Sequence, residues 1–191
     1  TLQKAKEIWK NNPYKLAWLE EIKNKKGFRI FIDFAHTPDS LREVLKYLKS
    51  ATRGKLICVF GCAGERDTKK RALMGEISAK IAGFSVFTAE DPRSEDVNSI
   101  ISLMVSGAVK NAVEKTLSFC TDDSNHQYSK NVFLRIPERG EAISFAIQKI
   151  AQKGDLVVIC GKGHEKSMAY DGIEYPWSDH QAVKIALKGD V

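Results

Sequence analysis

The sequence predicts an α/β domain built on a doubly wound, mainly parallel sheet of about six strands with helices on both faces. From Arg29 onward, short runs of β-branched and aromatic residues alternate with segments of helical periodicity, which is the pattern of strands joined by crossover helices. The length of 191 residues and the 43% share of hydrophobic side chains are enough for one full core and an appendage. We therefore expect one domain over residues 29–191, preceded over residues 1–28 by a linker or the tail of an upstream domain.

The first three strands are expected at residues 29–33, 56–60 and 84–88, and each is followed by a helix. Apolar residues recur at spacings i, i+3, i+4 and i+7 after the first strand, which predicts one buried helical face. The three helices are predicted from Leu41, Val44, Leu45 and Leu48; from Met74, Ile77 and Ile81; and from Ile100, Ile101, Met104 and Val105, with the last continuing through Val113.

The second half of the chain begins with a polar stretch, residues 121–131, which we expect to be a surface loop. A short strand at 132–134 and a helix opened by Pro137 follow, and the run at 156–159 is apolar enough to be a central strand. A hairpin is expected around Asp171 and Gly172, and a last helix is expected to be capped by Ser178. The first 28 residues mix apolar residues with lysines and predict one or two amphipathic helices.

Composition points to a cytoplasmic protein without a membrane span. No apolar run approaches the roughly 18–20 residues of a spanning helix. The first residues lack a secretory signal, and the initial threonine suggests a piece excised from a longer protein. The four cysteines, Cys58, Cys62, Cys120 and Cys160, are too scattered for a disulfide framework and fit small buried hydrophobes better than a zinc site.

The net charge of +6 could indicate a nucleic-acid partner, but the lysines are dispersed along the chain. The densest group, Lys23, Lys25 and Lys26, is followed directly by a predicted strand and is expected to be a solvated loop. A positive excess also suits a domain that handles phosphates or carboxylates. We expect neither a nucleic-acid nor a membrane partner.

Polar loops follow four of the predicted strands and form the candidate site. Ligands of a doubly wound sheet bind outside the carboxyl ends of the strands, so these loops are expected to line one edge. Asp33 and His36 suit a ribose or a phosphate-bound metal, and Arg93 can bind a carboxylate in bidentate fashion. Arg66, Lys69, Lys70 and Arg71 form an anion site near a helix start, and a buried Glu165 could receive an ammonium group. Together they predict a pocket for a zwitterionic amino acid beside a nucleotide.

Three familiar motifs are missing from the sequence. Lys162 stands between two glycines and is not followed by Ser or Thr, so there is no phosphate-binding P-loop. Gly61 and Gly64 do not complete the G-x-G-x-x-G fingerprint of a dinucleotide-binding domain, and no G-x-S-x-G elbow indicates a serine hydrolase.

Several loops resemble, in order and spacing, the motifs of the Mur ligase family. Residues 34–39 (FAHTPD) resemble YAHTPD, 60–71 (FGCAGERDTKKR) resemble FGCGGDRDxxKR, and 88–96 are similar to TxDNPRxED. Residues 137–143 (PERGEAI) resemble the start of the DRxEAI helix, 161–165 match GKGHE, and 177–179 (WSD) resemble FSD. The resemblance spans roughly residues 30–187 and implies the Rossmann-like carboxy-terminal domain of such a ligase.

This resemblance implies an ATP-dependent amide ligation in peptidoglycan precursor synthesis. The carboxylate of UDP-N-acetylmuramoyl-L-alanyl-D-glutamate is phosphorylated and then attacked by the amino group of meso-diaminopimelate or lysine. By motif, the amino acid would be bound by Arg71, Asp91, Pro92, Arg93, Gly161 and Glu165, and the nucleotide would face Asp33 and His36. The resemblance implies no catalytic residue and no metal ligand in this chain. ATP and magnesium would be held mainly by an upstream ATPase domain that has no counterpart here, so the fragment alone should be inactive.

The chain departs from the family pattern at three of these positions. Asp91 stands where diaminopimelate-adding enzymes carry Asn, and a carboxylate there would repel a substrate carboxylate and welcome an ammonium. Arg93 favours diaminopimelate and Asp91 favours lysine, so both substrates stay open. Ala63 for Gly and Glu65 for Asp are milder changes. A non-catalytic binding or regulatory module that retains the fold is the alternative function.

Overall fold

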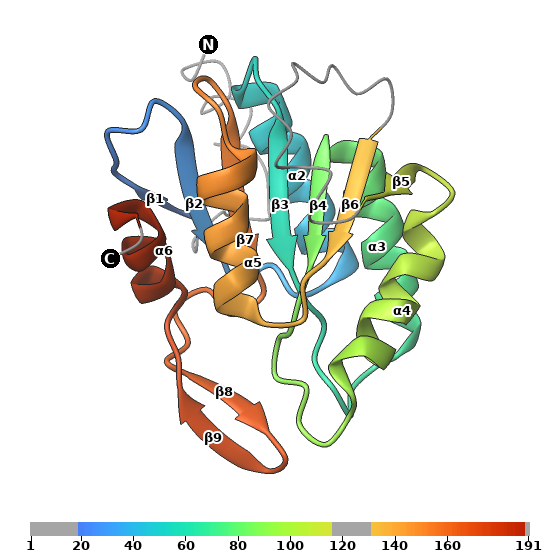
Figure 1. Ribbon diagram of the computed structural model, residues 1–191. Coiled ribbons are helices and arrows are strands. Elements are labelled where there is room, and N and C mark those ends of the chain that lie inside the picture. Colours follow the sequence, from blue (N-terminus) through green and yellow to red (C-terminus); the bar gives the residue numbers. More distant parts are fainter. Residues whose placement is uncertain (1–18, 116–130, 190–191) are drawn as a thin grey trace.

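The protein is described by a computed structural model that covers residues 19–115 and 131–189. Its main sheet has seven strands in the order β1-β2-β7-β3-β4-β6-β5, and every pair except β1–β2 is parallel (Figure 1). The strands are β1 (Glu20–Ile22), β2 (Arg29–Asp33), β3 (Leu56–Phe60), β4 (Phe84–Phe87), β5 (Ala112–Glu114), β6 (Asn131–Arg135) and β7 (Leu156–Cys160). The predicted fold class is confirmed.

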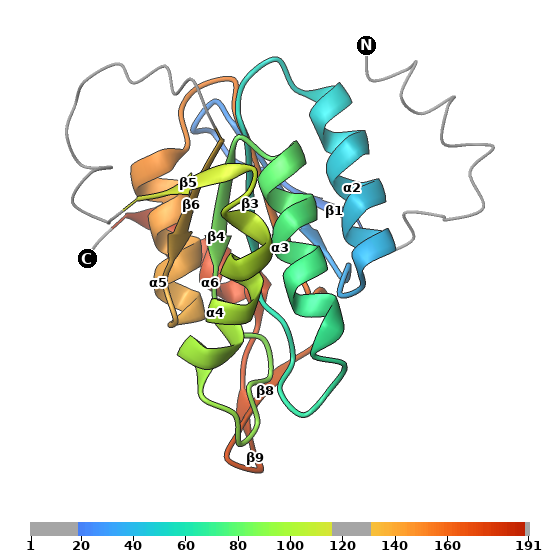
Figure 2. The same cartoon turned by 90° about the vertical axis from the view of Figure 1, so that its right-hand side faces the viewer.

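Helices cover both faces of the sheet (Figure 2). One face carries α2 (Pro38–Ala51), α3 (Lys69–Ile81) and α4 (Val97–Ala108); the other carries α5 (Arg139–Phe145), its π-helical continuation η2 (Ala146–Ile150) and α6 (Asp179–Lys188). Each layer has its own core, with Leu45, Met74 and Met104 on the first side and Ile143 and Val183 on the second. β7 lies between β2 and β3 and is buried throughout, as its apolar sequence predicted.

The helix starts follow the local sequence. Thr37 and Ser40 form a reciprocal capping box at the start of α2, whose predicted inner face is fully buried. The predicted cap Ser178 accepts a hydrogen bond from the Gln181 amide at the start of α6. In that helix Val183 is buried, whereas Ile185 is 70% exposed.

Two predicted helical segments are strands. α4 ends at Ala108, and residues 112–114 pair with β6 as strand β5, although the helix was expected to continue through Val113. Residues 20–22 form β1 rather than part of an amphipathic helix, since they pair with residues 30–32 of β2. In both cases pairing with a neighbouring strand outweighs a weak local periodicity. Residues 1–18 and most of the loop expected at 121–131 lie outside the described residues, and the domain boundary at residue 28 stays a prediction.

A two-stranded hairpin, β8 (Ser167–Tyr170) and β9 (Ile173–Pro176), extends past the carboxyl ends of the strands (Figure 1). Asp171 and Gly172 form its turn with φ angles of 49° and 76°, as a two-residue hairpin turn of type I′ requires. The hairpin predicted at these two residues is confirmed.

Cys58, Cys62 and Cys160 are free and buried, which confirms that they act as small hydrophobes; Cys120 lies outside the described residues. In the part of the chain that the structure covers, no helix has the length and apolar character needed to cross a membrane.

Candidate functional site

A pocket of about 490 Å³ lies at the carboxyl edge of the sheet, where the loops after β2, β3, β4 and β7 meet. Loops that leave neighbouring parallel strands emerge at the same edge, which explains why segments far apart in sequence meet here. The lining residues are Phe34, His36, Thr37, Ala63, Arg66, Asp67, Lys70, Glu90, Asp91, Arg93, Gly161 and Glu165. The four loops singled out in the sequence therefore line one pocket.

Five of the eight residues assigned to ligands by motif line this pocket, His36, Asp91, Arg93, Gly161 and Glu165, and so do Arg66 and Lys70 of the predicted anion site. Asp33, Arg71 and Pro92 do not. Asp33 is 5% exposed, its Oδ1 accepts a 2.8 Å hydrogen bond from the Ala35 amide, and burial raises its pKa to about 6. Its expected contact with the nucleotide stays a prediction.

Arg71 lies beneath the pocket rather than in its wall. Its guanidinium is 1% exposed and donates to both carboxylate oxygens of Glu95, at 2.7 and 2.8 Å, and to the Ala63 carbonyl at 3.0 Å. The ion pair holds the pKa of Glu95 down at about 2. Arg71 therefore anchors the loop after β3 to the start of α4, and its role in binding the amino acid stays a prediction.

Lys162 joins the two carboxylates that were expected to face the ligand. Its Nζ lies 2.7 Å from Asp91 Oδ1 and 2.7 Å from Glu165 Oε2, and its side chain is only 2% exposed. Glu165 is 39% exposed, so the expectation that it is buried is wrong, because the ion pair holds it at the rim. The charge of Lys162 offsets much of the negative charge that Asp91 brings to the pocket.

The hairpin fixes the backbone of the loop after β4. The Arg93 amide donates to the Ala169 carbonyl at 2.9 Å, the Asp171 amide donates to the Arg93 carbonyl at 2.7 Å, and the Ala169 amide donates to Asp91 Oδ1 at 3.0 Å. Asp91 and Arg93 both have positive φ, 42° and 55°, which non-glycine residues adopt rarely and at an energetic cost. β8 therefore holds a strained loop in the shape that brings both side chains to the pocket.

Two guanidinium groups at the pocket have no side-chain partner among the residues that the structure describes. Within residues 19–115 and 131–189, no hydrogen bond or ion pair reaches the side chain of Arg66 or of Arg93. Lys70, a third cation of the lining, donates to the His36 carbonyl at 2.9 Å. Arginine binds carboxylates in bidentate geometry, so the pocket offers two sites for a ligand carboxylate.

Glu90 is the buried carboxyl group of the pocket. It is 6% exposed, and burial raises its pKa to about 8, so the group is mostly protonated at neutral pH. A β-carbon on Gly161 would lie 2.4 Å from Glu90 Oε2, and one on Gly61 would lie 2.8 Å from Glu90 Cβ. The glycines that end β3 and β7 thus leave the space that this side chain fills.

Arg139 fixes the strand ends behind the pocket. It is fully buried and donates to both carboxylate oxygens of Asp179 at 2.8 Å, while it also donates to the carbonyls of Ala89 at 3.1 Å and Cys160 at 3.0 Å. Those carbonyls directly precede Glu90 and Gly161. The Trp177 indole donates to the same aspartate at 2.9 Å. One buried ion pair therefore ties α5 and α6 to the two strands whose loops line the site.

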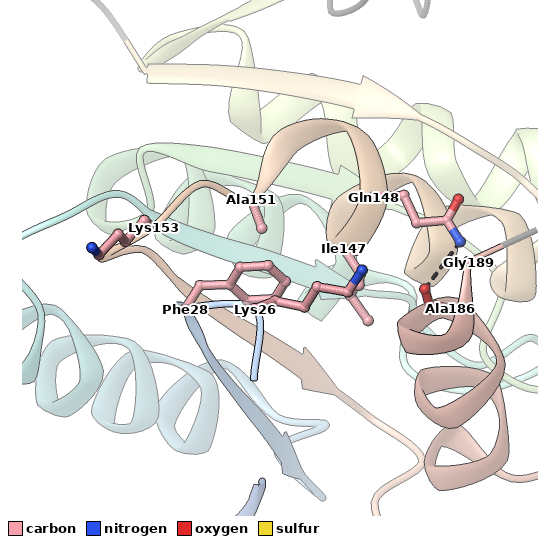
Figure 3. Close-up of a pocket in the computed structure, with 8 residues that line it drawn as sticks. All are labelled: Lys26, Phe28, Ile147, Gln148, Ala151, Lys153, Ala186 and Gly189. Carbon is pink, nitrogen blue, oxygen red and sulfur yellow. Dashed lines mark hydrogen bonds between the residues drawn. The ribbon is translucent and has the colours of Figure 1, made fainter. Parts of the chain in front are cut away.

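A second pocket, of about 380 Å³, lies at the opposite end of the sheet, where β2 and β7 begin (Figure 3). It is lined by Lys26, Phe28, Ile147, Gln148, Ala151, Lys153, Ala186 and Gly189, none of which was expected to bind a ligand. Gln148 donates to the Ala186 carbonyl at 3.0 Å and so joins η2 to α6. The candidate site is therefore the pocket at the carboxyl edge.

Sequence reasoning placed Glu90 in a loop of the site without giving it a role, and it missed Lys162 as the partner of Asp91. Lys162 was considered only as a P-loop lysine; its pairing with Glu165 depends on the turn in which the Glu165 amide donates to the Lys162 carbonyl at 3.0 Å. Glu90 had a weak signal, a carboxylate in the loop after a strand with no helix start to cap. Across the described ranges, no group of three or more His, Cys, Asp or Glu residues is placed to hold a metal ion.

Comparison with known proteins matches residues 19–163 to the family model described as Mur ligase, glutamate ligase domain. Two relatives, from Syntrophomonas wolfei and Aquifex aeolicus, are each named UDP-N-acetylmuramoyl-L-alanyl-D-glutamate--2,6-diaminopimelate ligase. The first is 39% identical over 90% of this chain and 32% of its own length, and the second is 36% identical over 89% and 31%. The chain thus spans about a third of the length of these relatives.

Solved structures give the same picture of the fold. A structure of a protein with that same ligase name superposes with a TM-score of 0.73 at 34% identity, over 90% of this chain and 31% of the other. A murein peptide ligase from Psychrobacter arcticus superposes with a TM-score of 0.57 at 18% identity, over 90% of this chain and 30% of the other, and supports the fold alone.

Proposed function

This chain belongs to the Mur ligase family, as its glutamate ligase domain, and on that premise we propose that it recognises the incoming amino acid in an ATP-dependent amide ligation. The full-length enzyme would join meso-diaminopimelate to UDP-N-acetylmuramoyl-L-alanyl-D-glutamate, in the cytoplasm, during peptidoglycan precursor synthesis. This domain would bind the amino acid and close over ATP. ATP and magnesium would be held mainly by an upstream domain of the full-length enzyme.

The observation that carries this proposal is the distribution of charge in the pocket. Arg66 and Arg93 are available for carboxylates, and Lys162, which Asp91 shares with Glu165, offsets part of the negative charge of Asp91. A substrate carboxylate would therefore meet two guanidinium groups and a partly compensated charge at position 91. Diaminopimelate has two carboxylates where lysine has one, so a pocket with this balance supports diaminopimelate as the substrate. The names of the relatives point to the same amino acid.

Asp91→Asn is expected to increase the preference for diaminopimelate over lysine by roughly tenfold, the effect of about one unit of charge at short range in a partly screened site. The substitution leaves Lys162 paired with Glu165 alone and so adds positive charge where carboxylates bind. Calorimetric titration of the purified chain and of the variant with diaminopimelate, lysine and ornithine measures the ratio.

Asp67→Asn is the matched control, because Asp67 lines the same pocket and its carboxylate accepts from the Lys69 amide at 2.9 Å rather than from Lys162. It makes the same charge change without releasing that lysine. An unchanged ratio in Asp91→Asn, or an equal change in both variants, would show that the Asp91–Lys162 pair does not set the preference.

The purified 191-residue chain is expected to bind the amino acid and to show no ligase activity. The sequence lacks a P-loop, and the chain spans about a third of its relatives. The measurement is ATP-dependent formation of the UDP-linked tripeptide, monitored by mass spectrometry with a full-length ligase as the positive control. Tripeptide formation by the chain alone would contradict the proposal.

A further inference from the structure

The amino edge of the sheet, opposite the candidate site, gathers cations from loops that are far apart in sequence. β2, β7 and β3 begin at this edge, and the β8–β9 hairpin extends from the other end of the molecule (Figure 1). The helices α2, η2 and α6 end at the same edge, because each runs antiparallel to the parallel strands. The exposed cations of this edge are Lys23, Lys25, Lys26, Lys49, Arg53, Lys149, Lys153 and Lys188.

These cations are dispersed along the sequence, and for that reason no membrane or nucleic-acid partner was expected. Folding removes that reason, because the loops that lead into neighbouring parallel strands lie side by side, as the loops that leave them do. Lys23, Lys25 and Lys26 precede β2, Arg53 precedes β3, and Lys153 precedes β7. Since β7 lies between β2 and β3, these loop cations share one face.

Carboxylates at this edge already have partners. Asp155 is buried and accepts from the Lys55 and Gln152 amides at 2.8 and 3.0 Å. Glu21 pairs with Arg29 at 2.7 Å. Among the residues that the structure describes, no hydrogen bond or ion pair reaches the charged group of any of the loop cations. The face therefore carries positive charge that an anionic partner can neutralise.

Helix ends explain only part of this charge. Lys49, Lys149 and Lys188 lie in the last turns of α2, η2 and α6, where a cation offsets the partial negative charge of the helix end. Lys23 and Lys25 lie between β1 and β2, in a loop that follows no helix. Helix stability therefore does not account for the loop cations.

The pocket of about 380 Å³ at this edge is partly apolar (Figure 3). Phe28 and Ile147, which are 8% and 3% exposed, belong to its wall together with Lys26 and Lys153. In the close-up, the ammonium group of Lys26 reaches toward Ile147, and that of Lys153 lies on the other side of Phe28. A phospholipid offers the matching features, an anionic head group joined to apolar carbons.

Part of the pocket wall comes from a π-helix. Ile147 and Gln148 are consecutive residues of η2, and both line the pocket. π-helical turns are rare in proteins and occur frequently at functional sites. This observation is independent of the charge and favours a ligand at the same place.

A nucleic acid matches this face less well than a lipid surface. Single-stranded nucleic acids stack their bases on accessible aromatic side chains, whereas Phe28, the aromatic residue of the pocket, is buried. The loop cations are lysines apart from Arg53. Lysine lacks the bidentate geometry with which arginine recognises phosphates and bases, but its charge is sufficient for attraction to an anionic lipid surface.

We propose that the amino edge of the sheet binds the surface of an anionic phospholipid membrane, with one head group seated in the pocket beside Lys26 and Phe28. The contact is peripheral and mainly electrostatic. It leaves the candidate site, at the carboxyl edge, facing away from the membrane. The proposal does not depend on the proposed function, because the two surfaces lie at opposite ends of the sheet.

Co-sedimentation of the 191-residue chain with vesicles tests this proposal. Vesicles of phosphatidylglycerol and phosphatidylcholine in equal parts should bind the chain at about 0.05 M salt. Vesicles of phosphatidylcholine alone should bind it at least roughly tenfold more weakly, because they carry no net charge. Raising the salt to about 0.5 M should release the chain, since it shortens the screening length to about 4 Å.

Two double variants test the face from separate loops. Lys25→Gln/Lys26→Gln changes the loop before β2, and Arg53→Gln/Lys153→Gln changes the loops before β3 and β7. Each variant should bind the mixed vesicles roughly tenfold more weakly than the wild type, because each loses two charges near the lipid surface. All four side chains are exposed, so both variants should keep the fold.

Lys166→Gln/Lys184→Gln is the matched control, because it removes two exposed charges away from the amino edge. It should bind the mixed vesicles as the wild type does. Equal binding of the wild type to both kinds of vesicle, or equal weakening by the control and the edge variants, would overturn the proposal. Retention on double-stranded DNA under conditions in which the chain does not bind the mixed vesicles would overturn it in favour of a nucleic-acid partner.

Discussion

Arg139→Met is expected to lower the free energy of unfolding of the chain by about 3–5 kcal/mol, the usual cost of removing one partner of a buried ion pair. Arg139 and Asp179 are both fully buried and joined by two hydrogen bonds of 2.8 Å. Methionine keeps much of the volume but leaves the Asp179 carboxylate with the Trp177 indole as its remaining side-chain donor. It also removes the donors to the Ala89 and Cys160 carbonyls.

Urea unfolding at neutral pH measures the effect, and Arg135→Met is the matched control. Arg135 makes the same two-point contact with Glu114, at 2.6 and 3.2 Å, but both side chains are at least one-third exposed. Its loss should cost under about 1 kcal/mol, as for other exposed pairs. Equal losses of unfolding free energy in the two variants would show that burial does not increase the contribution of the Arg139–Asp179 pair to stability.

The same variant reaches the pocket through the strand ends. The two carbonyls bound by Arg139 directly precede Glu90 and Gly161, so a loss of these bonds loosens both loops. Asp179→Asn, combined with Arg139→Met in a double-mutant cycle, separates the pair itself from the carbonyl contacts. The coupling energy of the cycle measures the Arg139–Asp179 pair. The rest of the cost of Arg139→Met belongs to its bonds with the Ala89 and Cys160 carbonyls.

The sequence predicted the central strands and helices well because their periodicity comes from burial on one or both faces. β2 and β3 were placed at their observed bounds, and the inner face of α2 was read residue by residue. The edge strands β1 and β5 were missed because each has three residues, and their identity depends on a partner distant in sequence. A short exposed segment has no pattern that separates a strand from a frayed helix.

The site was predicted as a set of loops but not as a set of pairs. Side chains at the carboxyl ends of parallel strands must meet, so the placement of Asp91, Arg93 and Glu165 followed from topology. The partner that each charge selects did not follow. Asp91 and Lys162 are 71 residues apart and Arg71 and Glu95 are 24 apart, and only the folded backbone determines which charges lie within 3 Å.

The stability of the wild-type chain is expected to fall relative to Glu90→Gln as the pH rises from about 5 to 8. An unfolded glutamate ionises near pH 4.5, whereas Glu90 in the folded chain ionises near pH 8 because burial disfavours its charge. Between these values the folded state holds one more proton than the unfolded state, so raising the pH favours unfolding. Across this pH range the wild type should lose about 4 kcal/mol of unfolding free energy relative to Glu90→Gln.

Urea unfolding of the two proteins at several pH values between 5 and 9 measures this difference, because glutamine has no proton to gain or lose. Asp33, whose pKa is raised to about 6, destabilises both proteins in the same way over the lower part of the range and cancels in the comparison. The gap between the curves should open up to pH 8 and stay constant above it. Glu174→Gln, at an exposed position of β9, is the matched control and should follow the wild type at every pH. Parallel curves for the wild type and Glu90→Gln would mean that Glu90 ionises normally in the folded chain.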